Sequence, residues 1–227
     1  MAPLDPDLLL RAYSIGVFPM SDGRDARDVF WVEPRKRAVL PLGGFRLSRS
    51  LRKTIRADIF RVTRDTAFTA VLQHCADRSE TWINAPIEAS FNHLHELGHA
   101  HSIECWNGDR LVGGLYGVKL GGAFFGESMF SLESDASKVA LAWLVARLRV
   151  GGFELLDCQF MTDHLRSLGA TEILQKDYVS FLESALSAGA AAGADFGALD
   201  RLLVDSSSSA GAAAPGCVIA QLLAQTS

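Results

Sequence analysis

Two glycine-containing turns near the middle of the chain constrain its fold more than any other feature. Asn107-Gly108 and Gly121-Gly122 separate three apolar runs, HSIECW, RLVGGLYGVKL and AFFGESMFS. Glycine and asparagine supply the positive φ angles that short hairpin turns need, and apolar runs on both sides of such turns indicate paired strands. The pattern therefore predicts an antiparallel meander of three strands between residues 101 and 131.

A long amphipathic helix is predicted directly after the meander. The run DASKVALAWLVARLRV repeats apolar residues at intervals of three and four, which places them on one face of a helix. This inward face consists of Val139, Leu141, Leu144, Val145 and Leu148. Gly151-Gly152 ends the helix, FELLDCQF returns as a strand, and Thr162 is the predicted cap of a short helix, HLRSL.

The strand FELLDCQF carries an acid and an amide within an otherwise apolar run. Alternation along a strand places Asp157 and Gln159 on one face and Cys158 on the opposite face, toward the core. An ionised carboxylate is costly in an apolar core unless a partner compensates it. We therefore expect Asp157 and Gln159 to face a cleft, and we do not expect Cys158 to be a nucleophile.

The order of the predicted elements resembles that of GCN5-related acyltransferases. In that fold, three antiparallel strands lead into a long helix, and the next strand splays away from the last meander strand to leave a reaction cleft. We therefore expect an α+β domain with helices and an antiparallel-rich mixed sheet over residues 81–187. Residues 1–80 are predicted to form a small basic N-terminal α/β domain. Residues 188–227 are predicted to form an Ala-, Gly- and Ser-rich tail, flexible for the most part, whose apolar end VIAQLLA is a candidate for docking.

Composition is that of a globular enzyme without a membrane segment. Apolar residues make up 48% of the chain and charged residues 21%. The start, MAPLDPDLLLRAYS, lacks the basic residues of a secretory signal, and no apolar run approaches the roughly 18 residues that span a bilayer. The four cysteines lack a C-x-x-C spacing, which favours reduced thiols in the cytoplasm: Cys75, Cys105, Cys158 and Cys217.

Positive charge is concentrated in one segment near the N-terminus. Residues 35–64 hold ten basic residues and one acid, Asp58, whereas the rest of the chain carries an excess of thirteen negative charges. One basic stretch on an otherwise acidic chain indicates a polyanionic partner, and a solvated basic face is the alternative. The basic residues that crowd together most closely, and that we expect to contact phosphates, are Arg46, Arg49, Arg52, Lys53 and Arg56.

Two further motifs suggest chemistries that the surrounding residues disfavour. Acetyl-CoA enzymes of this fold place a glycine-rich loop before the long helix to hold a pyrophosphate. This chain has SLESDASKVAL there, and its acids would repel a pyrophosphate. The run HLHELGHAH holds four histidines, but Gly98 interrupts the helix that would align His95 with His99. We therefore expect neither CoA nor a bound metal.

With these motifs, the chain resembles the leucyl/phenylalanyl-tRNA–protein transferase family. The resemblance covers roughly residues 5–178 and includes RAYSIGVFPMS, FWVEP, TWI, LHELGHAHSIECW, LVGGLYGVKLGGAFFGESMFS, ASKVAL, LLDCQF and HLRSLGA. GESMFS together with LLDCQ is its most specific part. The chain departs from the family at Val32, where many members have tryptophan, and at Phe91, where many have tyrosine. The alanine-rich tail lies outside the resemblance.

The resemblance implies an enzyme that moves Leu, Phe or less often Met from its tRNA to the α-amine of a protein that begins with Arg or Lys. The product would enter the bacterial N-end rule pathway of protein degradation. The amine must lose a proton and attack an activated ester, so positioning can supply much of the catalysis without a cofactor or a metal. We expect a cytoplasmic enzyme that acts as a monomer and has no membrane partner.

The resemblance also implies roles for residues of the predicted cleft. Asp157 and Gln159 are the candidate catalytic residues, where Asp157 either accepts the amine proton or orients the amine while Gln159 or a ribose hydroxyl relays it. Glu127, with Asp157, is expected to hold the dicationic acceptor terminus. Residues expected to line an apolar pocket for the transferred side chain are Phe124, Met129, Leu144 and Leu156, and expected platforms for the terminal adenosine are Trp31 and Trp82.

Two other functions stay open on the sequence alone. A CoA-dependent N-acetyltransferase fits the predicted fold but lacks the pyrophosphate loop. A non-catalytic RNA-binding module accounts for the basic stretch but gives Asp157, Gln159 and Glu127 no task.

Overall fold

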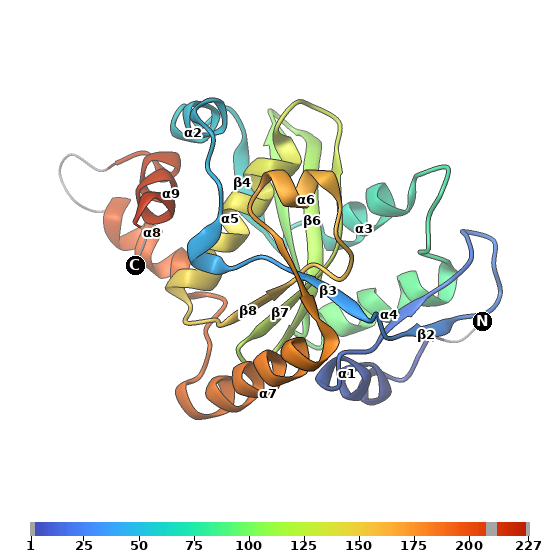
Figure 1. The fold of residues 1–227 in the computed structure, drawn as a ribbon. Helices are drawn as coiled ribbons and strands as arrows, with labels where there is room; N and C mark the ends of the chain where they lie inside the picture. Colours follow the sequence, from blue (N-terminus) through green and yellow to red (C-terminus); the bar gives the residue numbers. More distant parts are fainter. Residues whose placement is uncertain (1–2, 208–212, 226–227) are drawn as a thin grey trace.

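The computed structural model describes residues 3–207 and 213–225, and most strands within them join in one sheet (Figure 1). In this part of the chain the sheet has seven strands in the order β4-β5-β6-β7-β8-β3-β9. They are β3 (Lys36–Val39), β4 (Arg61–Arg64), β5 (Ala100–Asn107), β6 (Arg110–Leu120), β7 (Ala123–Ser131), β8 (Leu155–Asp157) and β9 (Thr171–Leu174). Neighbouring strands are antiparallel except β7 and β8, which run parallel. The predicted mixed α+β architecture with a mostly antiparallel sheet is confirmed.

The meander predicted from the glycine turns is also confirmed. β5, β6 and β7 pair in sequence order, and the pairs that close the two turns are Asn107↔Arg110 and Leu120↔Ala123. Gly108 and Gly121 have φ angles of 58° and 55°, which residues with a side chain rarely adopt. The turn glycines therefore fix the register of the three strands.

The sheet opens between β7 and β8. The two strands pair only from Ala123↔Leu155 to Phe125↔Asp157, after which β8 ends while β7 continues to Ser131. β7 also carries a bulge at this point, because Tyr116 pairs with Ser128 and Gly117 pairs with Gly126. Glu127 is therefore the extra residue of the bulge, and it lies where the two strands separate.

Helices cover both faces of the sheet, and each face has its own hydrophobic cluster. One cluster includes side chains of α2 (Arg49–Arg56), α5 (Ala136–Val150), α6 (Asp163–Ser167), α8 (Ala198–Ser207) and α9 (Pro215–Ala224). The other includes side chains of α1 (Pro6–Ser14), α3 (Phe68–Ala76), α4 (Ala85–Glu96) and α7 (Gln175–Ala192). Strand alternation separates them: Leu156 of β8 belongs to the first cluster and Leu155 to the second.

The predicted Thr162 cap and the predicted inward face of the long helix are confirmed. Ser48 Oγ accepts a hydrogen bond from the backbone N–H of Leu51 at the start of α2, and Thr162 Oγ1 does the same for Leu165 at the start of α6. All five apolar residues predicted to face inward from α5 are buried: Val139, Leu141, Leu144, Val145 and Leu148. α5 therefore sits against the sheet beside the point where β7 and β8 separate.

The first eighty residues contribute two strands to the same sheet as the rest of the chain. β3 lies between β8 and β9 and is antiparallel to both, and β4 forms the opposite edge next to β5. A separate hairpin of β1 (Phe18–Met20) and β2 (Phe30–Val32) lies near the N-terminus, and a short 3₁₀ helix spans Leu42–Gly44. The domain division into residues 1–80, 81–187 and 188–227 stays a prediction.

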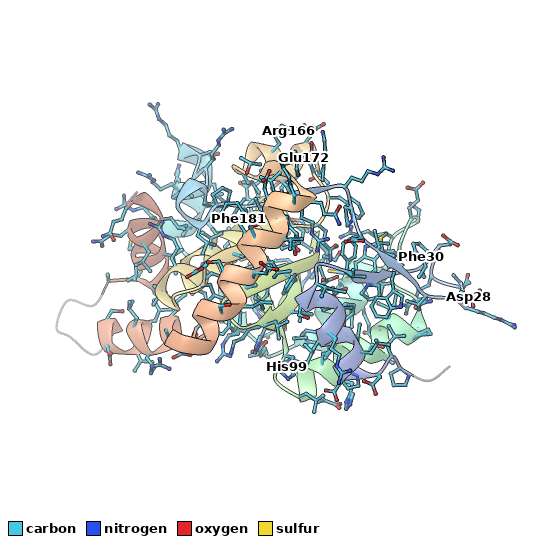
Figure 2. All side chains as sticks on the ribbon, turned by 60° about the horizontal axis from the view of Figure 1, so that its bottom comes forward. Asp28, Phe30, His99, Arg166, Glu172 and Phe181 are labelled. Carbon is cyan, nitrogen blue, oxygen red and sulfur yellow. The ribbon has the colours of Figure 1, made fainter. Side chains whose placement is uncertain are left out.

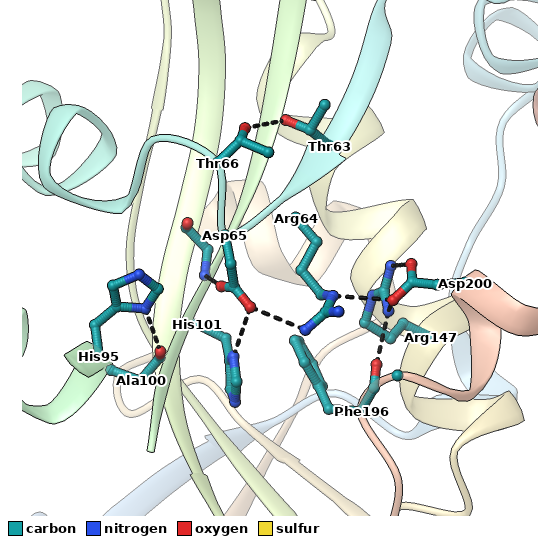
Figure 3. A network of polar contacts seen from close by, with 12 residues as sticks. Thr63, Arg64, Asp65, Thr66, His95, Ala100, His101, Arg147, Phe196 and Asp200 are labelled. Carbon is teal, nitrogen blue, oxygen red and sulfur yellow. Dashed lines mark hydrogen bonds and ion pairs between the residues drawn. The ribbon is translucent and has the colours of Figure 1, made fainter. Parts of the chain in front are cut away.

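The prediction of a largely flexible tail is wrong for the described residues after α7, because they form α8 and α9, which pack on the body of the protein. Arg147 of α5 is buried and donates hydrogen bonds to the carbonyl of Phe196 (2.6 Å) and to both carboxylate oxygens of Asp200 (2.5 and 2.8 Å), as Figure 3 shows. Arg64 of β4 reaches Asp200 from the other side at 3.0 Å. The tail is therefore tied to the sheet by a charged network.

The apolar end of the tail docks as α9. Ile219, Ala220 and Leu223 are buried in the cluster that holds α2 and α5. The backbone N–H of Gly216 donates to Asp58 Oδ1 at 2.9 Å, just after α2. A Cβ on Gly216 would lie 1.9 Å from the carbonyl oxygen of Ile55, so only glycine permits this close approach of α9 to α2.

The histidine-rich run is used for structural contacts. His95 Nδ1 donates to the carbonyl of Ala100 at 2.8 Å, and its ring stacks on Phe68. His101 Nδ1 lies 2.9 Å from Asp65 Oδ2, as Figure 3 shows. His99 lies at the surface (Figure 2).

Several large apolar side chains are exposed, among them Phe30 on β2 and Phe181 on α7 (Figure 2). Across residues 3–207 and 213–225, we find no helix with the length and apolar character that crossing a membrane requires.

Candidate active site

A cavity of about 390 Å³ opens where β7 and β8 separate. Its apolar wall comes from the strands and from α5 and α6: Leu115, Met129, Leu141, Leu144, Leu156 and Leu165. Polar and aromatic side chains line the remainder: Arg78, Trp82, Tyr116, Glu127, Ser128, Gln159, Phe160, Thr162 and His164, with Gly126 and Cys158 between them. An apolar hollow with a few convergent polar groups is the common form of a small-ligand site.

Three of the four residues predicted to line the apolar pocket do so. Met129, Leu144 and Leu156 are in the cavity wall. Phe124 is not, and that prediction is wrong: its ring is fully buried and stacks on Phe196, with centroids 5.4 Å apart. The reason is its position on β7, since Phe124 lies in the part of the strand that still pairs with β8.

Glu127 is held by two hydrogen bonds on one side and is free on the other. Its Oε1 accepts from Tyr13 Oη at 2.7 Å and from Gln159 Nε2 at 2.8 Å. Its Oε2 is buried and has no hydrogen-bond partner in the described structure. Burial raises the pKa of Glu127 to about 7, although the two hydrogen bonds act to lower it.

Asp157 is fully buried and each of its oxygens is occupied. Arg37 donates from Nε to Oδ1 at 2.9 Å and from Nη2 to Oδ2 at 2.6 Å. Tyr178 Oη donates to Oδ2 at 2.8 Å, and the backbone N–H of Gln159 donates to Oδ1 at 2.7 Å. Burial and the neighbouring charge of Asp157 raise the pKa of Tyr178 above its ordinary value, so this hydroxyl stays a donor.

Arg37 itself is buried and fixed from several sides. Its Nη1 donates to the carbonyl of Gly16 at 2.9 Å, and its guanidinium carbon lies 4.6 Å from the ring centres of both Phe18 and Tyr178. Arg37 is one of the ten basic residues of the segment 35–64, but its charge is compensated by Asp157 in the interior. This ion pair therefore joins β3 to the end of β8 next to the cavity.

Of the two side chains predicted to face a cleft, Gln159 lines the cavity and Asp157 does not. β8 ends at Asp157, and Gln159 has a left-handed backbone with a φ of 60°. Asp157 binds Arg37 and Tyr178 instead, and it is not among the residues that line the cavity. Gln159 lines the cavity and joins the two acids, because its backbone N–H bonds Asp157 and its side chain bonds Glu127.

Cys158 lies on the side of the chain predicted for it, but that side includes the cavity wall. It packs against the core that contains Leu156, and it also lines the cavity. Burial, with the charge of Asp157 nearby, raises the pKa of its thiol well above the ordinary value. Because the thiolate is the nucleophilic form, the raised pKa disfavours a nucleophilic role for Cys158.

The two predicted aromatic platforms are placed differently. Trp82 lines the cavity and meets Phe91 edge-on, with ring centroids 6.5 Å apart. Phe91 is fully buried, so the hydroxyl of a tyrosine at this position would lie in the core. Trp31 is exposed on β2 opposite Pro19, outside the cavity lining. Phe160, which the sequence did not single out, lies at the cavity with 45% of its surface exposed.

The five crowded basic residues form an exposed surface, which we call the α2 basic face. Four lie on α2 and one lies just before it, and all are exposed: Arg46, Arg49, Arg52, Lys53 and Arg56. None forms an ion pair with another residue in the described ranges, unlike Lys36 with Glu172 and Arg64 with Asp65. These five charges are therefore available to an outside partner.

Family models and individual relatives that match this chain all carry the same family name. The model of the leucyl/phenylalanyl-tRNA protein transferase family matches residues 39–183, and the model of that family's N-terminal domain matches residues 2–35. The leucyl/phenylalanyl-tRNA–protein transferase of Rhizorhabdus wittichii is 62% identical over an alignment of 248 positions that covers all of both chains. That of Zymomonas mobilis is 63% identical over 188 positions, covering 81% of this chain and 70% of the relative.

A solved structure with a partial likeness is the C-terminal domain of a lysylphosphatidylglycerol synthetase, described as putative, from Agrobacterium fabrum. It is 15% identical, with a TM-score of 0.35, and the match covers 73% of this chain and 56% of that one. A likeness this weak does not establish a shared fold.

Proposed function

The chain belongs to the leucyl/phenylalanyl-tRNA–protein transferase family and is an aminoacyltransferase, and we propose that the cavity between β7 and β8 is its active site. There, Leu or Phe, and less often Met, passes from aminoacyl-tRNA to the α-amine of a protein that begins with Arg or Lys. The product is marked for degradation in the bacterial N-end rule pathway. The single observation that carries this proposal is the apolar cavity that holds one buried carboxylate with a free oxygen, Glu127.

The apolar wall suits the side chain of the transferred amino acid. Met129, Leu144 and Leu156 offer only apolar contacts, and the thioether of Met129 adapts to several shapes. A pocket of this kind discriminates among apolar side chains by only about 1–3 kcal/mol. This weak discrimination supports the use of Leu, Phe and Met by one site.

The polar wall suits a cationic amine. Asp157 is neutralised by Arg37, so the carboxylate that is left to receive the acceptor's α-ammonium is Glu127. Asp157 then acts by holding the backbone of Gln159, and Gln159 orients Glu127. The sequence left two roles open for Asp157, accepting the amine proton or orienting the amine, and its place outside the cavity lining favours neither.

The α2 basic face suits the tRNA backbone. Exposed arginine and lysine side chains without protein partners release counterions when they contact phosphates, which gives affinity without reading the sequence. We propose that this face contacts the acceptor stem. We further propose that the terminal adenosine stacks on Trp82 or on the exposed Trp31, because every base offers a face for stacking.

The fold is proposed to be of the GCN5-related acyltransferase type. The order of the elements and the separation of the parallel strands β7 and β8 support this. We further propose a cytoplasmic monomer in which residues 1–80 present the basic surface and residues 81–187 hold the cavity.

One experiment separates this function from its rivals. The protein is incubated with labelled Leu-tRNA or labelled acetyl-CoA and with peptides that start with Arg, with Ala, or with N-acetylated Arg. We expect label from Leu-tRNA to reach only the free Arg peptide. Transfer of the acetyl label would indicate an acetyltransferase, and binding of tRNA with no transfer would indicate an RNA-binding module.

A further inference from the structure

The cavity contains most of the unsatisfied buried polar atoms in the described part of the chain. In the described part of the chain, four buried side-chain atoms have no hydrogen-bond partner: Tyr116 Oη, Glu127 Oε2, Arg147 Nε and His164 Nε2. All but Arg147 belong to residues that line the cavity. Buried polar groups are nearly always hydrogen-bonded in folded proteins, so a cluster of exceptions in one cavity indicates a site that a polar ligand completes.

The two carboxylates near this cavity differ in what they can still accept. Oδ1 of Asp157 accepts hydrogen bonds from Arg37 and the backbone of Gln159, Oδ2 accepts from Arg37 and Tyr178, and none of the Asp157 surface is exposed. Taking a proton would also leave the buried guanidinium of Arg37 without its counter-charge. Glu127 keeps one oxygen free, and its side chain is in the cavity wall.

We propose that Glu127 is the catalytic residue that accepts the proton of the acceptor's α-ammonium, and that Asp157 is a positioning residue that acts through Gln159. Tyr13 and Gln159 both bind Oε1 of Glu127, so they fix the carboxylate while leaving Oε2 for the amine. This inference rests on the proposed function, because it assigns the base for the aminoacyl transfer.

The step balances without a cofactor. The α-ammonium of the acceptor gives one proton to Glu127 Oε2 and becomes a neutral amine. The amine nitrogen forms a bond to the ester carbonyl carbon of the aminoacyl-tRNA, and the bond from that carbon to the ribose oxygen breaks. The second proton of the amine goes to the departing ribose oxygen, and protonated Glu127 returns its proton to solvent.

The surroundings of Glu127 make it a suitable base near neutral pH. The titratable and charged groups that face it or share its cavity are Tyr13 of α1, Arg37 of β3, Arg78 after α3, Tyr116 of β6, Asp157 of β8 and His164 of α6. Burial, with a smaller contribution from Asp157, raises the pKa of Glu127 to about 7. A general base is most effective when its pKa lies near the working pH.

The test uses two acceptors that differ in the proton they bring. One peptide starts with Arg, and the other is identical except that an aminooxy group, which is neutral at pH 7, replaces its α-amine. Single-turnover transfer of Leu from Leu-tRNA is measured at saturating peptide with the native protein and Glu127→Gln. We expect the substitution to slow transfer to the Arg peptide by roughly 10²–10⁴-fold, and to the aminooxy peptide by less than about tenfold.

Equal losses toward both peptides would overturn the proposal, because a structural role does not depend on the proton of the nucleophile. The matched control is Glu104→Gln, which changes another fully buried glutamate that is held by Ser102, Thr63 and Thr66. Glu104→Gln should change the rate of transfer to both peptides by the same factor. If the native protein transferred Leu to neither peptide, the proposed function itself would fail.

A second variant keeps the proposal testable if Glu127→Gln does not fold. Tyr13→Phe removes one hydrogen bond that stabilises ionised Glu127, so it should raise the pKa of Glu127. The rise of the single-turnover rate with pH should then shift to higher pH than in the native protein. An unchanged pH profile in a folded Tyr13→Phe protein would contradict the assignment.

Discussion

Arg37 and Asp157 form a buried ion pair that ties the third strand of the chain to the strand beside the cavity. Both side chains are nearly or wholly inaccessible to solvent, at 1% and 0% exposure, and Arg37 Nη2 lies 2.6 Å from Asp157 Oδ2. Asp157 also accepts a hydrogen bond from the backbone N–H of Gln159, whose side chain donates to Glu127, so the pair is linked to Glu127 through Gln159. The acid that is most prominent in the sequence therefore supports the site from behind the cavity wall.

This pair should matter for stability as much as for activity. Asp157→Asn leaves the Arg37 charge buried without a counter-charge, and breaking such a pair typically costs about 3–5 kcal/mol. We expect a loss of that order in the free energy of unfolding from urea denaturation followed by circular dichroism. A loss below about 1 kcal/mol, the usual size for an exposed pair, would show that solvent reaches Arg37. The exposed pair Lys36–Glu172 is the matched control, and Glu172→Gln should change little.

We expect the ionised carboxylate of buried Glu127 to lower the stability of the folded protein. A carboxyl whose pKa is raised in the folded state binds more protons when folded, so stability falls as the pH rises from about 4.5 to about 7 and then levels off. Glu127→Gln removes this effect. Thermal unfolding should show a higher midpoint for the variant at pH 8 and little difference at pH 4. A variant that is less stable than the native protein at pH 8 would contradict the raised pKa.

The α2 basic face should determine how tRNA binding responds to salt. Replacing Arg49, Arg52 and Arg56 by Gln removes three exposed charges, which should reduce the slope of log affinity against log salt by about 2 to 3. Filter binding of tRNA between low and physiological salt measures this slope. Arg11→Gln is the control, since Arg11 is exposed on α1 at the opposite end of the molecule (Figure 1). An unchanged slope in the triple variant would exclude this surface as the main phosphate contact.

The docking of α9 should hold the α2 basic face in place. Gly216→Ala would put a methyl group 1.9 Å from the carbonyl oxygen of Ile55, so α9 must move away from α2. We expect weaker tRNA binding and a lower thermal midpoint. Gly23→Ala is the matched control, because no atom beyond its two chain neighbours lies within 4 Å of the added methyl group. Native tRNA affinity in Gly216→Ala would show that α2 needs no support from the tail.

The sequence predicts the elements that depend on local periodicity and turn chemistry. The meander follows from its turn glycines, and the long helix follows from its apolar repeat, because both signals act over a few residues. The positions of Met129, Leu144 and Leu156 around one cavity follow from the family's order of elements.

Local patterns fail where a long-range contact decides the geometry. Alternation does not show that Asp157 stays out of the cavity, because Arg37 and Tyr178, which bind its carboxylate, come from other elements of the fold. Arg37 looks like one more surface charge, since nothing within its own segment indicates that β3 inserts between β8 and β9. Tyr13 lies 114 residues from its partner Glu127, so its role is visible only in the folded chain.

The measurement that tests the central claim most directly is cavity filling at Met129. This residue lies in the cavity wall and is only partly buried, so Met129→Trp can occupy the space proposed for the transferred side chain while the fold persists. Single-turnover transfer of Leu from Leu-tRNA to an Arg-starting peptide is compared with the native protein, with tRNA affinity measured on the same samples. We predict transfer slowed by more than about tenfold, the loss of 1.4 kcal/mol or more in transition-state stabilisation, with tRNA affinity retained. Native transfer rates in a folded Met129→Trp protein would mean that the aminoacyl group does not enter this cavity.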